Sequence, residues 1–134
     1  MPKVLIVDDS AIFRKLLKEA LHSRFPSMEI LEAGDAEEAS KKIKTSTPDL
    51  IFIDIKLPGE SGLELTKKIK TQNPDIPVFI LTSYDLPEYR EAAKQFQANH
   101  FLSKGSTTKE SILTLVESLL SDRNNDPNCL RDHS

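Results

Sequence analysis

Five side chains suited to binding a metal ion and a phosphoryl group are the first reactive residues after short apolar segments of the chain. They are Asp8, Asp9, Asp54, Thr82 and, two residues past its segment, Lys104. Taken singly, each has an ordinary structural explanation, such as a helix N-terminus, a turn, a β-branched strand residue or a surface cation. Their repeated position after successive segments favours a common site.

The three carboxylates predict a magnesium site. If Asp8, Asp9 and Asp54 lie within a few ångströms of one another, they must hold protons or bind a hard cation, because like charges repel. Mg²⁺ prefers octahedral oxygen ligands at about 2.0–2.1 Å, is commonly held by one or two carboxylates with waters, and leaves a position for a phosphate. We therefore expect Mg²⁺ as the cofactor.

The remaining two side chains suit a phosphoryl group. The hydroxyl of Thr82 and the ammonium of Lys104 could bind two phosphoryl oxygens. Phosphoryl transfer needs mainly positioning and charge neutralisation from a protein. The nucleophile must then be a carboxylate, and Asp54 stands alone at a strand end where in-line approach is open, whereas Asp8 and Asp9 are better placed to hold the metal.

The apolar segments have the length and pattern of buried parallel strands. Four are short apolar segments and one is mixed, at residues 4–7, 28–33, 50–53, 78–81 and 100–102. Apolar residues on consecutive positions are typical of strands that are covered on both faces, which indicates a parallel sheet and the α/β class. Right-handed crossovers then place every strand-to-helix loop at the C-terminal edge of the sheet, where the five reactive residues stand.

Between these strands, apolar residues recur three and four positions apart, as in amphipathic helices. The expected stripes are Ile12, Leu16 and Ala20 with Phe13, Leu17 and Leu21 beside them; Ala36, Ala39 and Ile43; Gly62, Leu65 and Ile69; Tyr89, Ala92, Ala93 and Phe96; and Ile112, Leu115, Val116 and Leu119. Ser10 is the expected N-cap of the first helix, and Thr107 with Glu110 forms a capping box for the last. The pattern stops after Leu120.

Composition limits the class of protein. A chain of 134 residues with 38% hydrophobic residues suits one globular domain, which we place at residues 1–121, with a disordered tail or the start of a linker at 122–134. Apolar runs do not exceed four residues, whereas a membrane helix needs about 20. The start of the chain lacks a secretory signal pattern, so we expect a cytoplasmic protein. With a net charge of −3 and no basic stripe, direct nucleic-acid binding is not expected.

Four stretches around these residues resemble the receiver domain of bacterial two-component response regulators, the CheY-like family. They are Val4-Leu5-Ile6-Val7-Asp8-Asp9-Ser10, Asp54-Ile55-Lys56-Leu57-Pro58-Gly59 with Gly62-Leu63, Leu81-Thr82-Ser83, and Phe101-Leu102-Ser103-Lys104. The resemblance covers about residues 3–120. It implies a doubly wound, five-stranded parallel sheet of order 2-1-3-4-5 in a flavodoxin-like three-layer sandwich, with its crevice between the first and third strands.

The resemblance also implies roles for the acidic residues. Asp54 would accept a phosphoryl group from a sensor histidine kinase or a phosphotransfer protein. Asp9, Asp54 and the backbone carbonyl of Lys56 would ligate Mg²⁺, and Asp8 would act mainly through water. The expected module is a monomer or weak dimer that catalyses only its own phosphorylation and dephosphorylation.

By the same resemblance, Thr82 and Lys104 would bind the phosphoryl oxygens, and Thr82 and Phe101 would form the switch that changes a partner-binding face. The sequence departs from the family at Gly105, where a proline usually follows the lysine through a cis bond. A cis bond that does not precede proline costs about 3–4 kcal/mol, which disfavours the family's cis bond between Lys104 and Gly105, but the sequence alone does not decide the isomer.

Three other interpretations remain open at this point. A Mg²⁺-dependent phosphatase with an aspartyl-phosphate intermediate would use the same chemistry, although phosphatases of the haloacid dehalogenase type need a second Asp two residues after the nucleophile. An FMN-binding flavodoxin-like carrier would need a phosphate loop where Asp8 and Asp9 stand. The chain could also be the receiver fragment of a DNA-binding response regulator.

Overall fold

The computed structural model describes residues 2–125, in which strands and helices alternate five times along the chain. The strands are β1 (Lys3–Val7), β2 (Glu29–Ala33), β3 (Leu50–Ile53), β4 (Val78–Thr82) and β5 (His100–Ser103). The helices are α1 (Ala11–Arg24), α2 (Ala36–Ser46), α3 (Gly62–Gln72), α4 (Pro87–Gln95) and α5 (Lys109–Asn125).

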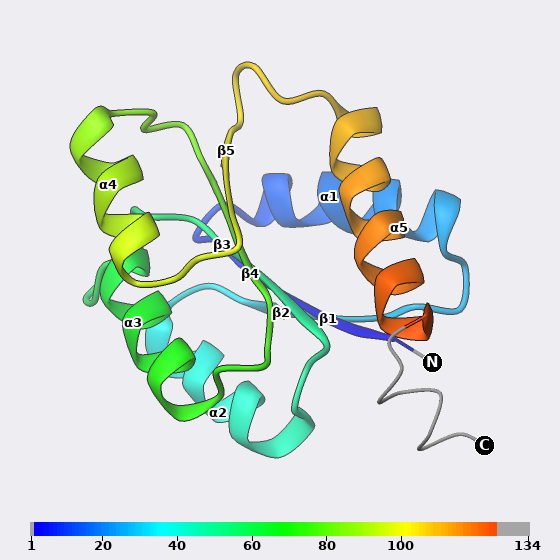
Figure 1. Ribbon diagram of the computed structural model, residues 1–134, viewed down its shortest axis with the longest axis horizontal. Helices are drawn as coiled ribbons and strands as arrows, with labels where there is room; N and C mark the ends of the chain where they lie inside the picture. The colour runs from blue at the N-terminus through cyan, green and yellow to red at the C-terminus, as the bar shows by residue number, and fades with distance from the viewer. Residues whose placement is uncertain (1, 126–134) are drawn as a thin grey trace.

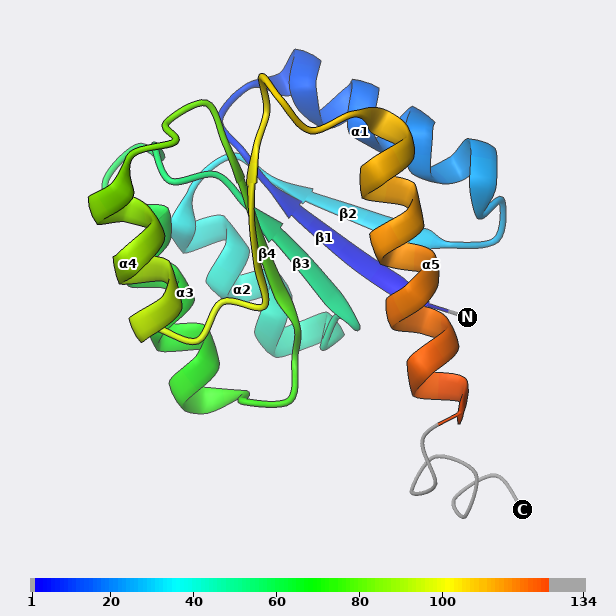
Figure 2. The ribbon, with the colours of Figure 1, turned by 45° about the horizontal axis from the view of Figure 1, so that its top comes forward.

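The strands form one parallel sheet in the order β2-β1-β3-β4-β5. Helices α1 and α5 cover one face, and α2, α3 and α4 cover the other (Figure 1; Figure 2). The expected α/β class, strand order and three-layer arrangement are confirmed. The chain turns in opposite directions from β1 and β3, so their C-terminal ends lie at the crevice of a doubly wound sheet.

Two apolar layers hold the helices against the sheet. Alternate strand residues point to opposite faces, so Phe52 and Phe79 pack toward α1 and α5, whereas Ile53 and Ile80 pack toward α2, α3 and α4. Burial is complete along β3 and β4, which explains their continuous apolar sequence. The mixed sequence of β5 fits its half-exposed position at the edge of the sheet.

Backbone hydrogen bonds align the strand ends at the C-terminal edge. The amide of Asp54 donates to the carbonyl of Val7 at 2.9 Å, and the amide of Asp8 donates to the carbonyl of Ala33 at 3.0 Å. At the other side of the edge, the amide of Lys104 donates to the carbonyl of Thr82 at 2.8 Å. The parallel ladder therefore continues into the loops that carry the predicted site residues.

Part of the expected apolar stripe of α1 is wrong. Leu17, Ala20 and Leu21 are buried, but Ile12 and Leu16 are 76% and 60% exposed. The sheet and α5 contact only one side of α1, and these two residues lie beyond that side. Spacing alone predicted a wider buried face than the packing provides.

The two ends of α5 also differ from the expectation. Its first turn is capped by Thr108, whose hydroxyl accepts a hydrogen bond from the amide of Ser111 at 3.0 Å, and the expected capping box of Thr107 and Glu110 does not form. The amide of Thr107 instead donates to the carbonyl of Ser103 in the preceding turn at 2.9 Å, so the helix begins later.

At its C-terminal end, α5 continues past Leu120 to Asn125, into the segment where we expected the tail to begin. The rest of the expected tail, residues 126–134, lies outside the described residues. Within residues 2–125, no helix has the length and apolar character needed to cross a membrane.

Candidate functional site

The five predicted site residues lie together at the C-terminal edge of the sheet. Asp8 directly follows β1, Asp54 follows β3, and Thr82 ends β4; all three are buried, at 2%, 6% and 0% exposed. Asp9 is exposed. One carboxylate oxygen from each of Asp8, Asp9 and Asp54 lies within 4.8 Å of the others. The convergence predicted from the strand ends is therefore confirmed.

The loop between β1 and α1 orients the first carboxylate. Asp8 Oδ1 accepts a hydrogen bond from the amide of Ser10 at 2.8 Å. Ser10 is the N-cap of α1, as predicted, because its hydroxyl accepts from the amide of Phe13 at 3.1 Å. The start of the helix thus holds the acidic loop against the end of β1.

Lys104 reaches both buried carboxylates. Its Nζ lies 2.7 Å from Asp8 Oδ2 and 3.3 Å from Asp54 Oδ2, and it also lies 4.0 Å from the centre of the Phe13 ring. Residues 2–125 contain no cis peptide bond, so the bond between Lys104 and Gly105 is trans. The glycine that replaces the usual proline therefore does not move the lysine away from the acids.

Burial and neighbouring charges shift the pKa values of Asp8 and Lys104. Burial raises the pKa of the Asp8 carboxyl above its ordinary value, and the hydrogen bonds from Lys104 and the Ser10 amide oppose this rise without cancelling it. Burial by itself lowers the pKa of Lys104, but its hydrogen bond to Asp8 and the charges of Asp54 and Asp8 outweigh that effect, so the pKa of Lys104 is raised. At neutral pH, one ammonium group thus faces more than one buried acid.

Asp54 retains an unused acceptor. Its Oδ2 faces Lys104, but its Oδ1 is buried and has no hydrogen-bond partner among residues 2–125. A buried, unpaired carboxylate oxygen is costly unless a ligand satisfies it. With the Asp8 and Asp9 oxygens close by, the donor set is all oxygen and negatively charged, which fits Mg²⁺.

The remaining predicted residues surround this cluster. The Thr82 hydroxyl is buried and accepts a hydrogen bond from the amide of Tyr84 at 3.3 Å. The ammonium of Lys56 lies 5.1 Å from the centre of the exposed Tyr84 ring. Phe101 on β5 is half-buried against the core beneath α3 and α4, with the Arg90 guanidinium 4.8 Å from its ring centre. The roles of the Lys56 carbonyl as a ligand and of Thr82 and Phe101 as a switch stay predictions.

Sequence reasoning missed the packing role of Gly62 at the start of α3. A Cβ atom there would lie 1.9 Å from the carbonyl oxygen of Asp54 and 2.9 Å from Ile53 Cγ2. The Gly62 amide donates to the carbonyl of Ile55 at 2.8 Å, which closes the loop after Asp54 onto the helix. A glycine directly after the N-cap residue Ser61 was the available signal.

Lys104→Ala should fold but lose stability in the absence of metal, by roughly 1–3 kcal/mol, because the substitution leaves the buried Asp8 carboxylate without its main partner. Because the pKa of Asp8 is raised, acidification protonates this carboxyl at a higher pH than it protonates an ordinary aspartate. The difference in unfolding free energy between Lys104→Ala and wild type should therefore shrink as the pH falls through the raised pKa of Asp8. Denaturant unfolding at several pH values measures this difference.

The control for this substitution is Lys15→Ala, which removes an exposed lysine of α1. It should leave the stability unchanged at every pH. A difference between Lys104→Ala and wild type that stays constant on acidification would mean that the ion pair with Asp8 is not what Lys104 contributes.

Comparisons with known proteins agree with this geometry. Residues 4–117 match the family described as the response regulator receiver domain. The chain is 32% identical over 112 residues to a probable transcriptional regulatory protein, TcrX, of Mycobacterium tuberculosis, covering 84% of this chain and 47% of that protein. It is 35% identical to a protein-glutamate methylesterase/protein-glutamine glutaminase of Halalkalibacterium halodurans, covering 90% of this chain and 35% of that enzyme. The chain thus spans less than half the length of these relatives.

Solved structures show the same likeness along most of the chain. A CheY-like response regulator receiver domain protein from Methanospirillum hungatei superposes with a TM-score of 0.85 at 25% identity, covering 94% of this chain and 98% of that one. The response regulator TrrA from Thermotoga maritima, solved in complex with Mg(2+)-BeF, superposes with a TM-score of 0.79 at 34% identity, covering 89% and 99% of the two chains. The fold, the acidic edge and the family match together lead to one conclusion: this chain belongs to the family of response regulator receiver domains.

Proposed function

We propose that this receiver domain takes a phosphoryl group onto Asp54 from a sensor histidine kinase or a phosphotransfer protein. The observation that carries the proposal is the state of Asp54: a buried carboxylate with an unpaired Oδ1, 3.3 Å from the Lys104 ammonium and beside two further acids. A buried carboxylate next to a cation and a metal-binding set of oxygens suits attack on a phosphorus atom.

In the proposed step, a carboxylate oxygen of Asp54 forms a bond to phosphorus while the bond from phosphorus to the donor's histidine nitrogen breaks, and that nitrogen keeps the electron pair. The Lys104 ammonium turns from the carboxylates toward the phosphoryl oxygens. Among residues 2–125, the Thr82 hydroxyl accepts a hydrogen bond from the Tyr84 amide and donates none, so its proton is free to donate to another phosphoryl oxygen.

Asp8, Asp9, Asp54 and the carbonyl of Lys56 are the proposed residues that hold Mg²⁺. When bound, the cation neutralises charge on the carboxylates and on the phosphoryl oxygens. In the metal-free protein, Lys104 performs part of this neutralisation through its contacts to Asp8 and Asp54. The lysine is therefore available to the phosphoryl group once a divalent cation shares the charge of the acids.

The proposed output is a change at the face formed by α4, β5 and α5. Movement of Thr82 toward the phosphoryl group would vacate space behind it, and Phe101 on the adjacent strand would fill that space. Thr82 pairs with Ser103 in the ladder between β4 and β5, and Phe101 pairs with Ile80, so the two residues lie on neighbouring strands within two positions of register. A downstream protein or an output domain would bind the changed face.

The surface beside Lys104 fits a phosphodonor protein. Ile12 and Leu16 of α1 are exposed apolar residues, and Leu16 lines a groove of about 480 Å³ between α1 and α5 that also contains Lys104 and Ile112. Exposed apolar patches next to a reactive centre are typical of protein docking sites. We infer that the phosphodonor contacts α1 here. We also propose that this chain is cytoplasmic.

The test is to incubate the full chain with acetyl phosphate and Mg²⁺ and to measure its intact mass. One phosphoryl adduct is expected, and Asp54→Asn should carry none. Asp75→Asn, which changes an exposed acid in the loop before β4 at the opposite edge of the sheet, should take up the group like wild type. An adduct that persists in Asp54→Asn would refute the acceptor, and steady hydrolysis of a phosphomonoester would favour the phosphatase interpretation.

A further inference from the structure

We propose that Arg14 on α1 is a positioning residue for the metal site: anchored by Glu32 on β2, it fixes the peptide that joins Asp8 to Asp9. This inference rests on the proposed function, because it concerns the residues that would hold Mg²⁺. Neither Arg14 nor Glu32 directly follows a strand, and the sequence motifs give these two residues no role.

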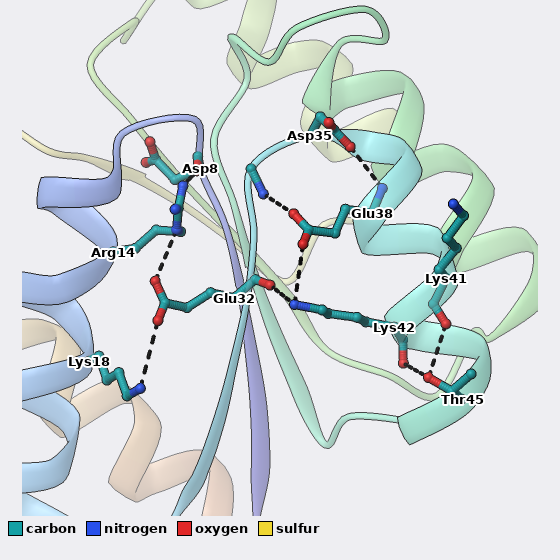
Figure 3. A network of polar contacts seen from close by, with 10 residues as sticks. Asp8, Arg14, Lys18, Glu32, Asp35, Glu38, Lys41, Lys42 and Thr45 are labelled. Atoms are coloured by element: carbon teal, nitrogen blue, oxygen red, sulfur yellow. Dashed lines mark hydrogen bonds and ion pairs between the residues drawn. The ribbon is translucent and has the colours of Figure 1, made fainter.

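The contact geometry is a fork between three segments of the chain. Arg14 Nη1 donates to the backbone carbonyl of Asp8 at 2.5 Å, and Arg14 Nε donates to Glu32 Oε1 at 3.0 Å. The Arg14 side chain is only 18% exposed. Figure 3 shows the arginine lying between the Asp8 loop and the Glu32 carboxylate. The planar guanidinium thus links α1, the loop after β1, and β2, with little freedom to rotate.

Glu32 is itself held on both sides of the strand. Its Oε2 lies 3.7 Å from the ammonium of Lys18, and its backbone carbonyl accepts a hydrogen bond from Lys42 of α2 (Figure 3). In the sheet, Glu32 pairs with Ile6, two residues before Asp8. The strand therefore presents the carboxylate at a fixed level just below the acidic loop, where it can hold Arg14.

The peptide between Asp8 and Asp9 is the part of the site that this fork controls. The amide of Asp8 is fixed by the Ala33 carbonyl, and its side chain is fixed by Ser10 and Lys104. Among residues 2–125, by contrast, the Asp9 carboxylate makes no hydrogen bond or ion pair. Its direction toward the other acids depends on the orientation of the preceding peptide, whose carbonyl oxygen is the one that Arg14 holds.

Charge and position predict opposite effects of losing Arg14, which makes the inference testable. A guanidinium near a cation site repels the cation, so removing its charge should tighten binding if charge alone mattered. Glu32 neutralises that charge at 3.0 Å, so what remains is the hydrogen bond to the Asp8 carbonyl. Loss of a residue that orients a ligand typically weakens metal binding by roughly 10–100-fold.

The experiment titrates the full-length chain with Mg²⁺ by calorimetry, comparing wild type, Arg14→Ala, Arg14→Lys and Lys18→Ala. We expect Arg14→Ala to bind about 10-fold more weakly. Arg14→Lys should be intermediate, because one ammonium cannot hold both the Asp8 carbonyl and Glu32 in a planar fork. The control, Lys18→Ala, removes the other cation on Glu32 without touching the acidic loop and should bind like wild type.

A second readout needs no metal. The amide of Asp9 belongs to the same peptide as the carbonyl that Arg14 holds, so its NMR chemical shift in the metal-free protein should change in Arg14→Ala and stay unchanged in Lys18→Ala. A role limited to general stability would lower the melting temperature without altering this amide or the Mg²⁺ affinity. If Arg14→Ala does not fold, Arg14→Lys supplies the test, because it keeps the positive charge but its single ammonium cannot hold both the Asp8 carbonyl and Glu32, so it should still bind Mg²⁺ more weakly and shift the Asp9 amide.

The outcomes separate the inference from the proposed function. Unchanged or tighter Mg²⁺ binding in folded Arg14→Ala, an equal loss in Lys18→Ala, or, where Arg14→Ala does not fold, wild-type affinity in Arg14→Lys would overturn the role of Arg14 while leaving the metal site intact. Wild-type protein that shows no saturable Mg²⁺ binding would overturn both the metal site and the inference.

Discussion

Asp9→Ala should abolish Mg²⁺-dependent phosphorylation of Asp54 and weaken Mg²⁺ binding by more than roughly 100-fold, because removing a direct ligand costs more than the roughly 10–100-fold typical of losing a residue that only orients one. Asp9 is the exposed member of the three carboxylates whose oxygens lie within 4.8 Å of one another, and its side chain has no partner among residues 2–125. Its charge therefore does nothing for packing and is available to a cation. Calorimetric titration and the intact-mass assay measure the two losses.

The same substitution should raise the stability of the metal-free protein, because it removes one of three mutually repelling charges. Asp75→Ala changes an exposed acid at the other edge of the sheet and should alter neither stability nor Mg²⁺ affinity. If Asp9→Ala kept the affinity of wild type, the metal ligands would have to be sought among other residues.

Gly62→Ala is expected to destabilise the protein by about 3 kcal/mol or more and to disturb Asp54, because the added methyl group has no space. Its carbon would lie 1.9 Å from the Asp54 carbonyl oxygen and 2.8 Å from the carbonyl carbon, both backbone atoms that cannot rotate away. The start of α3 would have to move away from β3. Urea unfolding gives the loss of stability, and the rate of phosphorylation from acetyl phosphate reports the effect on Asp54.

Gly105→Ala is the matched control for this glycine. It also changes a glycine beside a site residue, but its added carbon would meet only Ser103 Oγ, at 3.9 Å, which is an ordinary contact. We expect stability and phosphorylation close to wild type. A Gly62→Ala protein as stable as Gly105→Ala would mean that α3 does not need its close approach to Asp54.

Several local features followed from the sequence because they depend on residues near one another in the chain. Buried strands such as β3 are recognisable from their unbroken apolar runs, and Ser10 was identified as an N-cap from its place before the apolar stripe of α1. The polar residue at the end of each strand could be assigned to one edge, because all strands of a parallel sheet point the same way. The strand order itself came from the resemblance to receiver domains, since spacing does not specify which strands are neighbours.

Other features depend on contacts between distant parts of the chain. Apolar spacing placed Ile12 and Leu16 in the same stripe as Leu17, but only the position of α5 and the sheet leaves them exposed. The start of α5 moved to Lys109 because the turn after β5 uses the amide of Thr107. Local patterns describe what a helix can bury, whereas its neighbours decide what it does bury.

The candidate site shows the same division. Sequence alone predicted Asp8, Asp9, Asp54, Thr82 and Lys104 as candidate site residues at one edge of the sheet, because of their types and their positions after strands. Only the tertiary structure showed that Lys104 contacts both Asp8 and Asp54 although its bond to Gly105 is trans. It also showed that Gly62 packs against the Asp54 backbone and that Arg14 links Glu32 to the loop after β1. These contacts join residues separated by many positions along the chain, and their distances are set by strand register and helix packing, which no local pattern encodes.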